Sequence, residues 1–173
     1  MTDELLARAR RGDKTAFDEL LGPLIEPGYR VAFAVLHDRQ ESEDAVQEAA
    51  LAAWRRIVQL RDPALLRPWF FKIVVNCARM HRRRRWSSVI RLPDLHLPGH
   101  WSEEATASSL DLREAVRGLR QDDRLLLFLH YGLDLPLEEV APVLGLTPAG
   151  AKTRLYRTLR RLRPALVQEG SSV

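Results

Sequence analysis

The sequence predicts an all-α protein in which two small helical domains are joined by an extended flexible linker. Apolar residues recur with helical spacing along almost the whole chain, and almost no segment shows the alternation of a strand. Hydrophobic residues make up 46% of the 173 positions, which is enough to fill two small cores. One stretch rich in proline, serine and threonine lacks this periodicity. We therefore expect domains at residues 1–86 and 111–168, a linker at 87–110 and a tail at 169–173.

Glycine and proline pairs divide the first domain into helices. Gly22-Pro23 and Pro27-Gly28 are expected to interrupt one helical stretch, and Asp62-Pro63 is expected to end another. Ser42 is the expected N-cap of the longest helix, and Pro68 fits the first turn of the last one. The predicted helices cover residues 4–11, 15–21, 29–36, 43–60 and 68–85.

The second domain ends in a predicted helix-turn-helix unit. Gly145 ends a short amphipathic helix, and Thr147 with Pro148 supplies an N-cap followed by proline at the first helical position. Pro142 removes one backbone hydrogen bond from the first helix, and Pro164 is expected to end or kink the second helix early. The predicted helices cover residues 111–119, 122–131, 137–144 and 148–167.

Charge is segregated along the chain in a way that favours nucleic-acid binding. The net charge is +4, yet residues 69–91 carry seven basic and no acidic side chains, and residues 147–173 carry six basic side chains against one acidic. Each block ends a helical domain, so the pattern predicts two separate contacts with a polyanion. A single basic run is more often a solvated helix end, and that alternative stays open for each block taken alone.

Other classes of protein leave no signal in the sequence. No run of about eighteen apolar residues could cross a bilayer, and the acidic start of the chain does not resemble an export signal. Cys77 is the only cysteine, and no Cys/His cluster has zinc spacing. No nucleophile–base–acid set and no phosphate-binding glycine loop is present. We therefore expect a cytoplasmic protein without membrane insertion, metal or cofactor, and without enzyme activity.

Basic side chains on the last helix lie outside its apolar stripe. This division suits a helix in the major groove of DNA, where arginine binds base edges and lysine binds phosphate. An ordinary helical hairpin is the alternative interpretation. The side chains concerned are Lys152, Arg154, Arg157 and Arg161.

Two stripes at helical spacing mark candidate surfaces in the first domain. The stripe on the helix over residues 43–60 is typical of a docking surface for a basic protein, although a solvated face is the commoner meaning. It consists of Asp44, Gln47, Glu48, Leu51 and Arg55. The stripe on the helix over residues 68–85 suits unpaired DNA, because aromatic rings stack on bases and cations follow the backbone. It consists of Trp69, Lys72, Asn76, Arg79 and Arg83.

Three segments resemble motifs of one family. Asp44, Gln47 and Glu48, with Trp54 after them, resemble the D-x-x-Q-E…W polymerase-docking motif of the sigma-2 domain. Residues 68–79 and the arginine run after them resemble the promoter-melting helix of that domain, and residues 137–157 resemble the sigma-4 helix-turn-helix. The order of these motifs is similar to that of the extracytoplasmic-function group of the sigma-70 family.

The resemblance implies a sigma-2 helical bundle and a sigma-4 domain that together bind core RNA polymerase and promoter DNA. Its polymerase contacts would be the clamp helices of the largest subunit and the flap, and an anti-sigma factor is a further implied partner. The core-binding residues would be Asp44, Gln47, Glu48, Leu51 and Arg55. The loop around residues 60–66 would help to bind and melt the −10 element, together with Trp69, Lys72, Asn76, Arg79, Arg82 and Arg83. The −35 element would be bound by Thr147, Lys152, Thr153, Arg154, Arg157 and Arg161.

Some positions depart from the pattern of the family. Val75 replaces a frequent arginine, Met80 a frequent acidic residue and Ala50 a frequent aromatic one, so the promoter sequence is not predicted. A conventional helix-turn-helix regulator with an N-terminal sensing or dimerisation domain is the main alternative. It accounts for residues 135–167, but not for the two stripes in the first domain.

Overall fold

The computed structural model describes residues 2–86 and 114–169, and all regular structure in these ranges is helical. The chain divides into two compact units, Met1–Pro93 and Asp94–Val173. This agrees with the predicted all-α class and with two domains. The predicted linker at 87–110 lies outside the described residues, and so does all but the first residue of the predicted tail. No helix in the described ranges is long and apolar enough to span a membrane.

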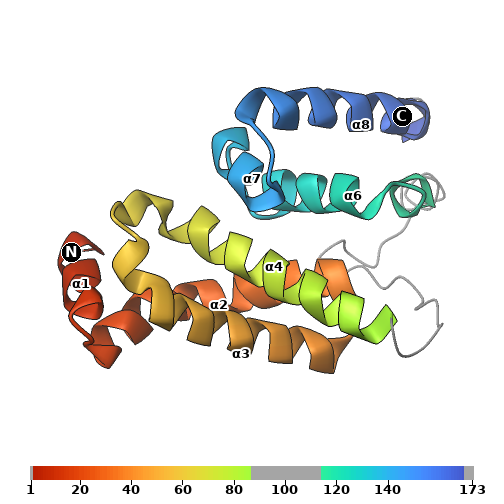
Figure 1. The fold of residues 1–173 in the computed structure, drawn as a ribbon. Helices are drawn as coiled ribbons and strands as arrows, with labels where there is room; N and C mark the ends of the chain where they lie inside the picture. Colours follow the sequence, from red (N-terminus) through yellow and green to blue (C-terminus); the bar gives the residue numbers. More distant parts are fainter. Residues whose placement is uncertain (1, 87–113, 170–173) are drawn as a thin grey trace. The chain divides into compact units, whose positions relative to one another are not determined.

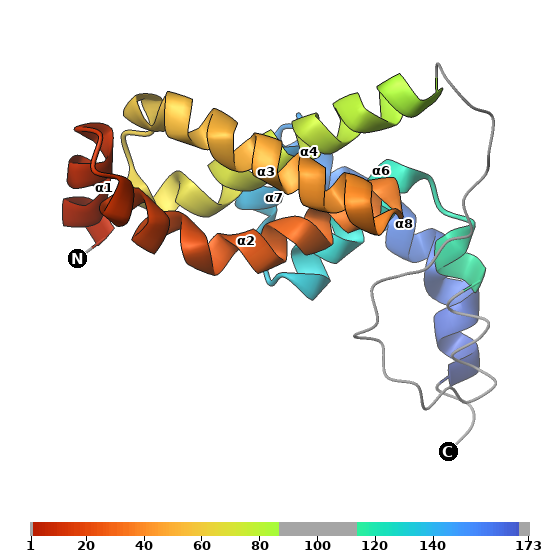
Figure 2. The same cartoon turned by 90° about the horizontal axis from the view of Figure 1, so that it is seen from below.

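The N-terminal unit is built from three long helices that run alongside one another, with a short helix across one end (Figures 1 and 2). The short helix is α1 (Thr2–Arg10), and the long ones are α2 (Lys14–Leu36), α3 (Arg39–Arg56) and α4 (Leu66–Trp86). α4 packs against both α2 and α3. The largest fully buried side chains of the unit come from α2 and α4, and they are Val31, Phe70, Phe71, Val74 and Val75.

The helix α2 is continuous where two breaks were predicted. Pro23 and Pro27 lie inside it, so the carbonyls of Glu19 and Pro23 lose their usual helical donors. Because the two prolines are four residues apart, they share one face, on which Pro23 is exposed and Pro27 is half-buried. The prediction of interruptions was wrong because burial of the opposite face outweighs the lost hydrogen bonds. Gly28 lies on that face, where an added Cβ would come within 3.0 Å of the Phe70 ring.

The helix α3 begins earlier than predicted. Its N-cap is Asp38, whose side chain accepts a hydrogen bond from the Glu41 backbone N–H at 3.0 Å. The predicted cap, Ser42, is buried inside the helix and donates its hydroxyl proton to the Asp38 carbonyl. The prediction was wrong because both residues are good capping residues, and burial of Ser42 favours the start at Asp38.

The connection from α3 to α4 consists of two short 3₁₀ turns, η1 (Ile57–Gln59) and η2 (Pro63–Leu65). The predicted break at Asp62-Pro63 is confirmed, since the Asp62 side chain caps η2 by accepting from the Ala64 N–H at 2.9 Å. Leu60 is buried and anchors the connection, whereas Val58 and Leu65 are more than half exposed.

The C-terminal unit contains a short helical segment at 114–117, followed by α6 (Gln121–Leu127), the π-helical turn η3 (Phe128–Gly132), α7 (Leu137–Leu144) and α8 (Pro148–Glu169). α8 packs against α6 and α7 (Figure 1). The predicted bounds of α7 are confirmed, and Pro142 is accommodated on its exposed side. Gly145 ends α7 with a φ of 73°, which favours glycine. Pro164 was expected to end or kink α8, and the first of these alternatives is wrong, because the helix continues to Glu169.

Candidate nucleic-acid and partner interfaces

The predicted docking stripe lies on the outer side of α3. Gln47, Leu51 and Arg55 are exposed, and Asp44 and Glu48 are half-buried. Leu51 keeps 57% of its surface in contact with solvent, so it gives the stripe an exposed apolar side chain. The opposite side of α3 carries Val46, Ala49 and other small residues into the core, as the sequence predicted. The stripe therefore combines carboxylates, an amide, a cation and an apolar side chain on one accessible surface.

The predicted stripe on α4 is accessible to a similar degree. Lys72, Asn76 and Arg83 are exposed, and Trp69, Arg79 and Arg82 are half-buried. Phe70, Ile73, Val74 and Cys77 all point into the core, as predicted. Since Trp69 is only half-buried, part of its ring is available for stacking.

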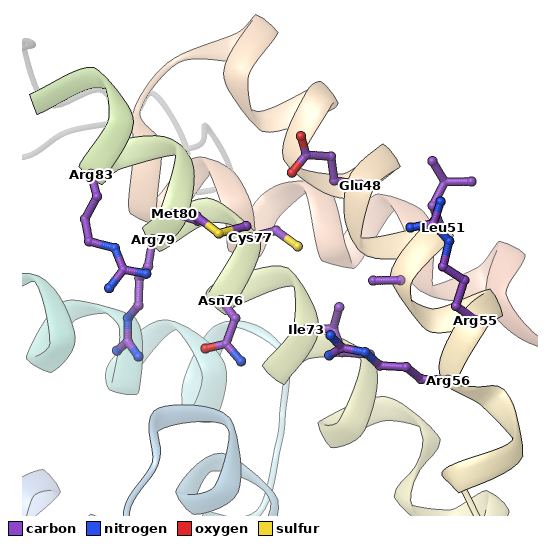
Figure 3. Close-up of a pocket in the computed structure, with 11 residues that line it drawn as sticks. Glu48, Leu51, Arg55, Arg56, Ile73, Asn76, Cys77, Arg79, Met80 and Arg83 are labelled. Atoms are coloured by element: carbon purple, nitrogen blue, oxygen red, sulfur yellow. The ribbon is translucent and has the colours of Figure 1, made fainter. Parts of the chain in front are cut away.

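A groove between α3 and α4 joins the two stripes. Its volume is about 730 Å³, and it is lined by Glu48, Leu51 and Arg55 of the docking stripe and by Asn76, Arg79 and Arg83 of the α4 stripe. In Figure 3, Arg79 and Arg83 extend from one side of α4, and Arg55 and Arg56 extend from α3. The rest of the lining consists of Arg56 and of four apolar side chains, namely Ala52, Ile73, Cys77 and Met80. The sequence predicted the stripes but not that they share a groove.

His81 connects α4 to two carboxylates of α3. Its Nδ1 lies 2.7 Å from Glu41 Oε2, and its Nε2 lies 3.1 Å from Glu48 Oε2. The first contact is a hydrogen bond, whereas the second has the distance of an ion pair without hydrogen-bond geometry. Burial lowers the pKa of His81, but the contacts with Glu41 and Glu48 raise it by more, so the pKa lies above its ordinary value of 6.5.

On α8, most of the predicted DNA-binding side chains are exposed. Lys152, Thr153, Arg157 and Arg161 face solvent. Thr147 caps the helix, since its hydroxyl accepts a hydrogen bond from the Gly150 N–H at 3.1 Å. The Thr153 hydroxyl donates to the Ala149 carbonyl at 2.9 Å, so its proton is already used within the helix.

Arg154 differs from these residues because its guanidinium is bound inside the C-terminal unit. Its Nε donates to Asp123 Oδ1 at 2.6 Å, and its Nη2 lies 3.7 Å from Asp122 Oδ2. The Arg154 side chain is only 24% exposed, and the Asp123 side chain only 8%. Arg161 Nη1 also approaches Asp123, at 3.9 Å. The structure therefore gives Arg154 a contact with α6 that competes with the base-reading role expected from the sequence.

Three residues of these surfaces were missed by the sequence interpretation. Tyr156 lies among the predicted contacts on α8 and is 61% exposed, as an aromatic group beside cations would be if it met DNA bases. His81 and Asp123 were missed because their partners lie 40 and 31 residues away in the sequence. Helical spacing would have found Tyr156, which falls four residues after Lys152 and next to Arg157.

Within the described residues, no group of three or more His, Cys, Asp or Glu side chains could hold a metal ion. Cys77 is buried, and burial raises the pKa of its thiol, with a further contribution from the charge of Glu48.

Comparison with known proteins identifies both units. The model of the family "Sigma-70 region 2" matches residues 19–88, and that of "Sigma-70, region 4" matches residues 109–162. The chain is 32% identical over 146 residues to RNA polymerase sigma factor SigV of Bacillus subtilis, covering 83% of this chain and 87% of that protein. It is 27% identical over 160 residues to ECF RNA polymerase sigma factor SigM of Mycobacterium tuberculosis, covering 92% and 81%.

Two solved structures share the fold. CnrH, determined in complex with the cytosolic domain of CnrY, has a TM-score of 0.67 at 21% identity and covers 98% of both chains. The sigma factor RpoE of Bartonella quintana, determined with the anti-sigma factor NepR, has a TM-score of 0.65 at 22% identity and covers 87% of this chain and 96% of that one. The family matches and the curated relatives together show that this chain belongs to the extracytoplasmic-function group of the sigma-70 family.

Proposed function

We propose that the protein binds core RNA polymerase, directs it to specific promoters and assists DNA melting, and that it does so in the cytoplasm without catalysing bond chemistry. The observation that carries the proposal is the presence of two accessible cationic helices in separate units, α4 beside a protein-docking stripe and α8 in a helix-turn-helix. A conventional regulator needs the second helix but not the first. The proposed domain limits are residues 1–86 and 111–168.

Core polymerase is proposed to dock on the α3 stripe. Exposed Leu51 provides apolar area, and the half-buried carboxylates of Asp44 and Glu48 provide charge that a basic partner would match. Gln47 and Arg55 would hydrogen-bond at its edge. The clamp helices of the largest subunit are the proposed partner of this stripe, and the flap is the proposed partner of the C-terminal unit.

The −10 element is proposed to meet α4 and the α3–α4 connection. Lys72, Arg82 and Arg83 would bind phosphates, and Trp69 would stack on a base as the strands part. Asn76 and Arg79 line the groove, where an amide and a guanidinium can both hydrogen-bond the edge of an unpaired base.

The −35 element is proposed to bind α8 as duplex DNA. Lys152 and Arg157 are exposed on the first turns of the helix, where a recognition helix reaches base edges, and Thr147 stands at its N-terminus. Arg161 lies farther along and suits a phosphate. We assign Arg154 mainly to holding α8 on α6, because its guanidinium already bonds Asp123.

Run-off transcription with core polymerase tests the proposal. Purified protein added to core enzyme should start transcription at a cognate promoter, and mapping of the start sites should place −10 and −35 elements upstream. Core enzyme alone is the control. If the protein binds DNA but confers no initiation, it is a conventional helix-turn-helix regulator and the proposal is wrong.

An anti-sigma factor is proposed as a further partner, because the two solved relatives described above were determined with CnrY and with the anti-sigma factor NepR. Such a protein would cover the α3 stripe and compete with core enzyme. Its addition should therefore reduce run-off transcription, and an excess of core enzyme should restore it.

A further inference from the structure

We propose that His81, as an imidazolium, is a positioning residue that holds the basic C-terminal end of α4 against α3. The structural part of this inference stands alone, and its consequence for promoter binding rests on the proposed function. Of the two predicted stripes, only Glu48 takes part in this link, and the sequence interpretation gave His81 no role.

The position of the ring between two carboxylates favours a doubly protonated imidazole. His81 is only 10% exposed, between Glu41 and Glu48, which lie seven residues and therefore two turns apart on one face of α3. A carboxylate only accepts hydrogen bonds, and a neutral imidazole has a single N–H to donate. The charged ring can donate a hydrogen bond to Glu41 and also attract the Glu48 carboxylate at 3.1 Å, whereas a neutral ring can donate to one of them only. Glu41 and Glu48 are the charged groups that act on the ring.

The end of α4 needs such a link because it is strongly cationic. Arg82, Arg83, Arg84 and Arg85 follow His81 directly, and their charges repel one another in a helix. Arg84 Nη1 lies 4.0 Å from Glu48 Oε1, so the carboxylate held by His81 also faces this run. The bridge therefore both anchors the last turns of α4 and fixes the carboxylate that offsets part of their charge.

The link must weaken as the pH rises. The pKa of His81 is higher in the folded protein than its ordinary value of 6.5, because the two carboxylates favour the charged ring more than burial disfavours it. Its contribution to stability is therefore complete below the ordinary pKa and is lost as the pH rises through the folded-state pKa. When the ring loses a proton, its contact with Glu48 should be lost before its contact with Glu41. The Glu48 contact is the longer of the two and lacks hydrogen-bond geometry.

Release would change the groove between the proposed polymerase and promoter surfaces. Glu48 lines this groove, and Asn76, Arg79 and Arg83 of α4 face it. When the last turns of α4 loosen, these side chains lose their fixed distance from α3. We therefore expect binding of promoter DNA by the holoenzyme to weaken over the same pH range in which the ring loses its proton.

Hydrogen exchange of the full chain tests the structural part. Protection factors of the α4 amides at 78–84, corrected for the intrinsic exchange rate, should fall about fivefold or more between pH 6 and 8.5. In His81→Gln, the protection factors of these amides should already be low at pH 6 and should change little between pH 6 and 8.5. Glu41→Gln should reduce the pH dependence by removing the shorter contact. Glu43→Gln is the matched control, because Glu43 pairs with Arg39 on the solvent side of α3 and should behave as the unchanged protein.

Two outcomes of the exchange experiment would overturn the proposal. One is protection that does not depend on pH in the unchanged protein, and the other is an equal pH dependence in His81→Gln. If His81→Gln failed to fold, Glu41→Gln and an NMR titration of the His81 ring would still decide, because loss of Glu41 must lower the pKa of that ring.

Binding of the holoenzyme to a premelted promoter fork, measured over the same pH range, tests the consequence. Affinity should fall as the pH rises for the unchanged protein and for Glu43→Gln, but much less for His81→Gln. An equal fall in all three proteins would overturn the link between His81 and promoter binding. If the unchanged protein neither bound core enzyme nor supported initiation at any pH, the proposed function would fail, while the exchange data would still decide the role of His81.

Discussion

The two basic helices of this protein are braced by acidic neighbours in different ways. In α8, Arg154 bonds Asp123 of α6, whose side chain is almost fully buried. In α4, His81 hydrogen-bonds Glu41 of α3 and lies within ion-pair distance of Glu48, and these two side chains remain 36% and 44% exposed. Arginine keeps its charge across the pH range in which histidine titrates. The brace of α8 is therefore permanent, and the brace of α4 depends on pH.

This difference shows that only some basic side chains of a helix are available to DNA, because others are paired with carboxylates of the same domain. Residues 147–173 carry six basic side chains, but Arg154 and Arg161 both approach the single carboxylate of Asp123. The charge offered to DNA by α8 is thus smaller than the composition suggests. On α4, Lys72 and Arg83 lie exposed, and the charge of Arg84 is partly offset by Glu48.

The largest expected effect is that of Asp123→Asn on the C-terminal unit. Removal of the negative charge leaves the largely buried Arg154 guanidinium without its main counter-charge, which should lower the free energy of unfolding of this unit by about 2–4 kcal/mol. Hydrogen exchange of the α6 and α7 amides would measure it. Glu138→Gln, on the exposed side of α7, is the control. A loss below about 0.5 kcal/mol, as for an ordinary surface substitution, would show that the pair does not brace α8.

Asp44→Lys should have the next largest effect, on binding of core polymerase. A reversed charge within the docking stripe should weaken core affinity by about 1.5–3 kcal/mol. Glu48 is left unchanged in this test because it also contacts His81. Glu43→Lys makes the same change of charge on the same helix outside the stripe and should have little effect. Equal affinities of both variants, measured by titration of labelled protein with core enzyme, would remove α3 as the docking surface.

Arg157→Ala and Arg154→Ala should change binding to a panel of −35 sequences in different ways. The first should alter sequence preference, and the second should lower affinity for every sequence. Arg157 is exposed, and its loss should cost about 1–3 kcal/mol and relax recognition at one base position. Arg154→Ala should weaken binding to all sequences equally and should lower the stability of the unit, because it removes the bond to Asp123. If Arg154→Ala instead relaxed recognition at one position without loss of stability, the base-reading role expected from the sequence would be correct.

The sequence predicts the fold well where local signals agree. The bounds of α7 and the start of α8 follow from Gly145, Thr147 and Pro148, each of which has one strong backbone preference. The continuous α2 could not be predicted, because Pro23 and Pro27 disfavour a helix locally and only tertiary burial reverses that preference. The start of α3 was missed for a related reason, since Asp38 and Ser42 can both cap and only burial separates them.

The candidate surfaces were predicted less completely than the fold. Helical spacing gives the members of each stripe, because residues three and four apart share a face. Helical spacing cannot show which residue of another helix a charged side chain contacts. The bonds of Arg154 to Asp123 and of His81 to Glu41 join residues 31 and 40 positions apart, and they depend on how the helices pack. Whether an arginine is offered to DNA or held by its own domain is therefore a property of the folded structure.

The smallest expected effect is a change in the rate at which Cys77 is alkylated. This rate shows whether the negative charge of Glu48 acts on the thiol in the groove. Burial raises the pKa of this thiol above its ordinary value of 9.0, and the negative charge of Glu48 raises it further, whereas Arg56 lowers it. The folded protein should react with iodoacetamide about tenfold more slowly than the protein in urea, because only the thiolate is nucleophilic. Glu48→Gln should speed the reaction by only about twofold, since burial is the larger cause.

Glu43→Gln should leave the rate unchanged, and an equal acceleration by both variants would mean that the charge of Glu48 is directed away from the groove and toward solvent. In that case Glu48 would not contribute to the brace of α4, which would rest on the hydrogen bond between His81 and Glu41 alone.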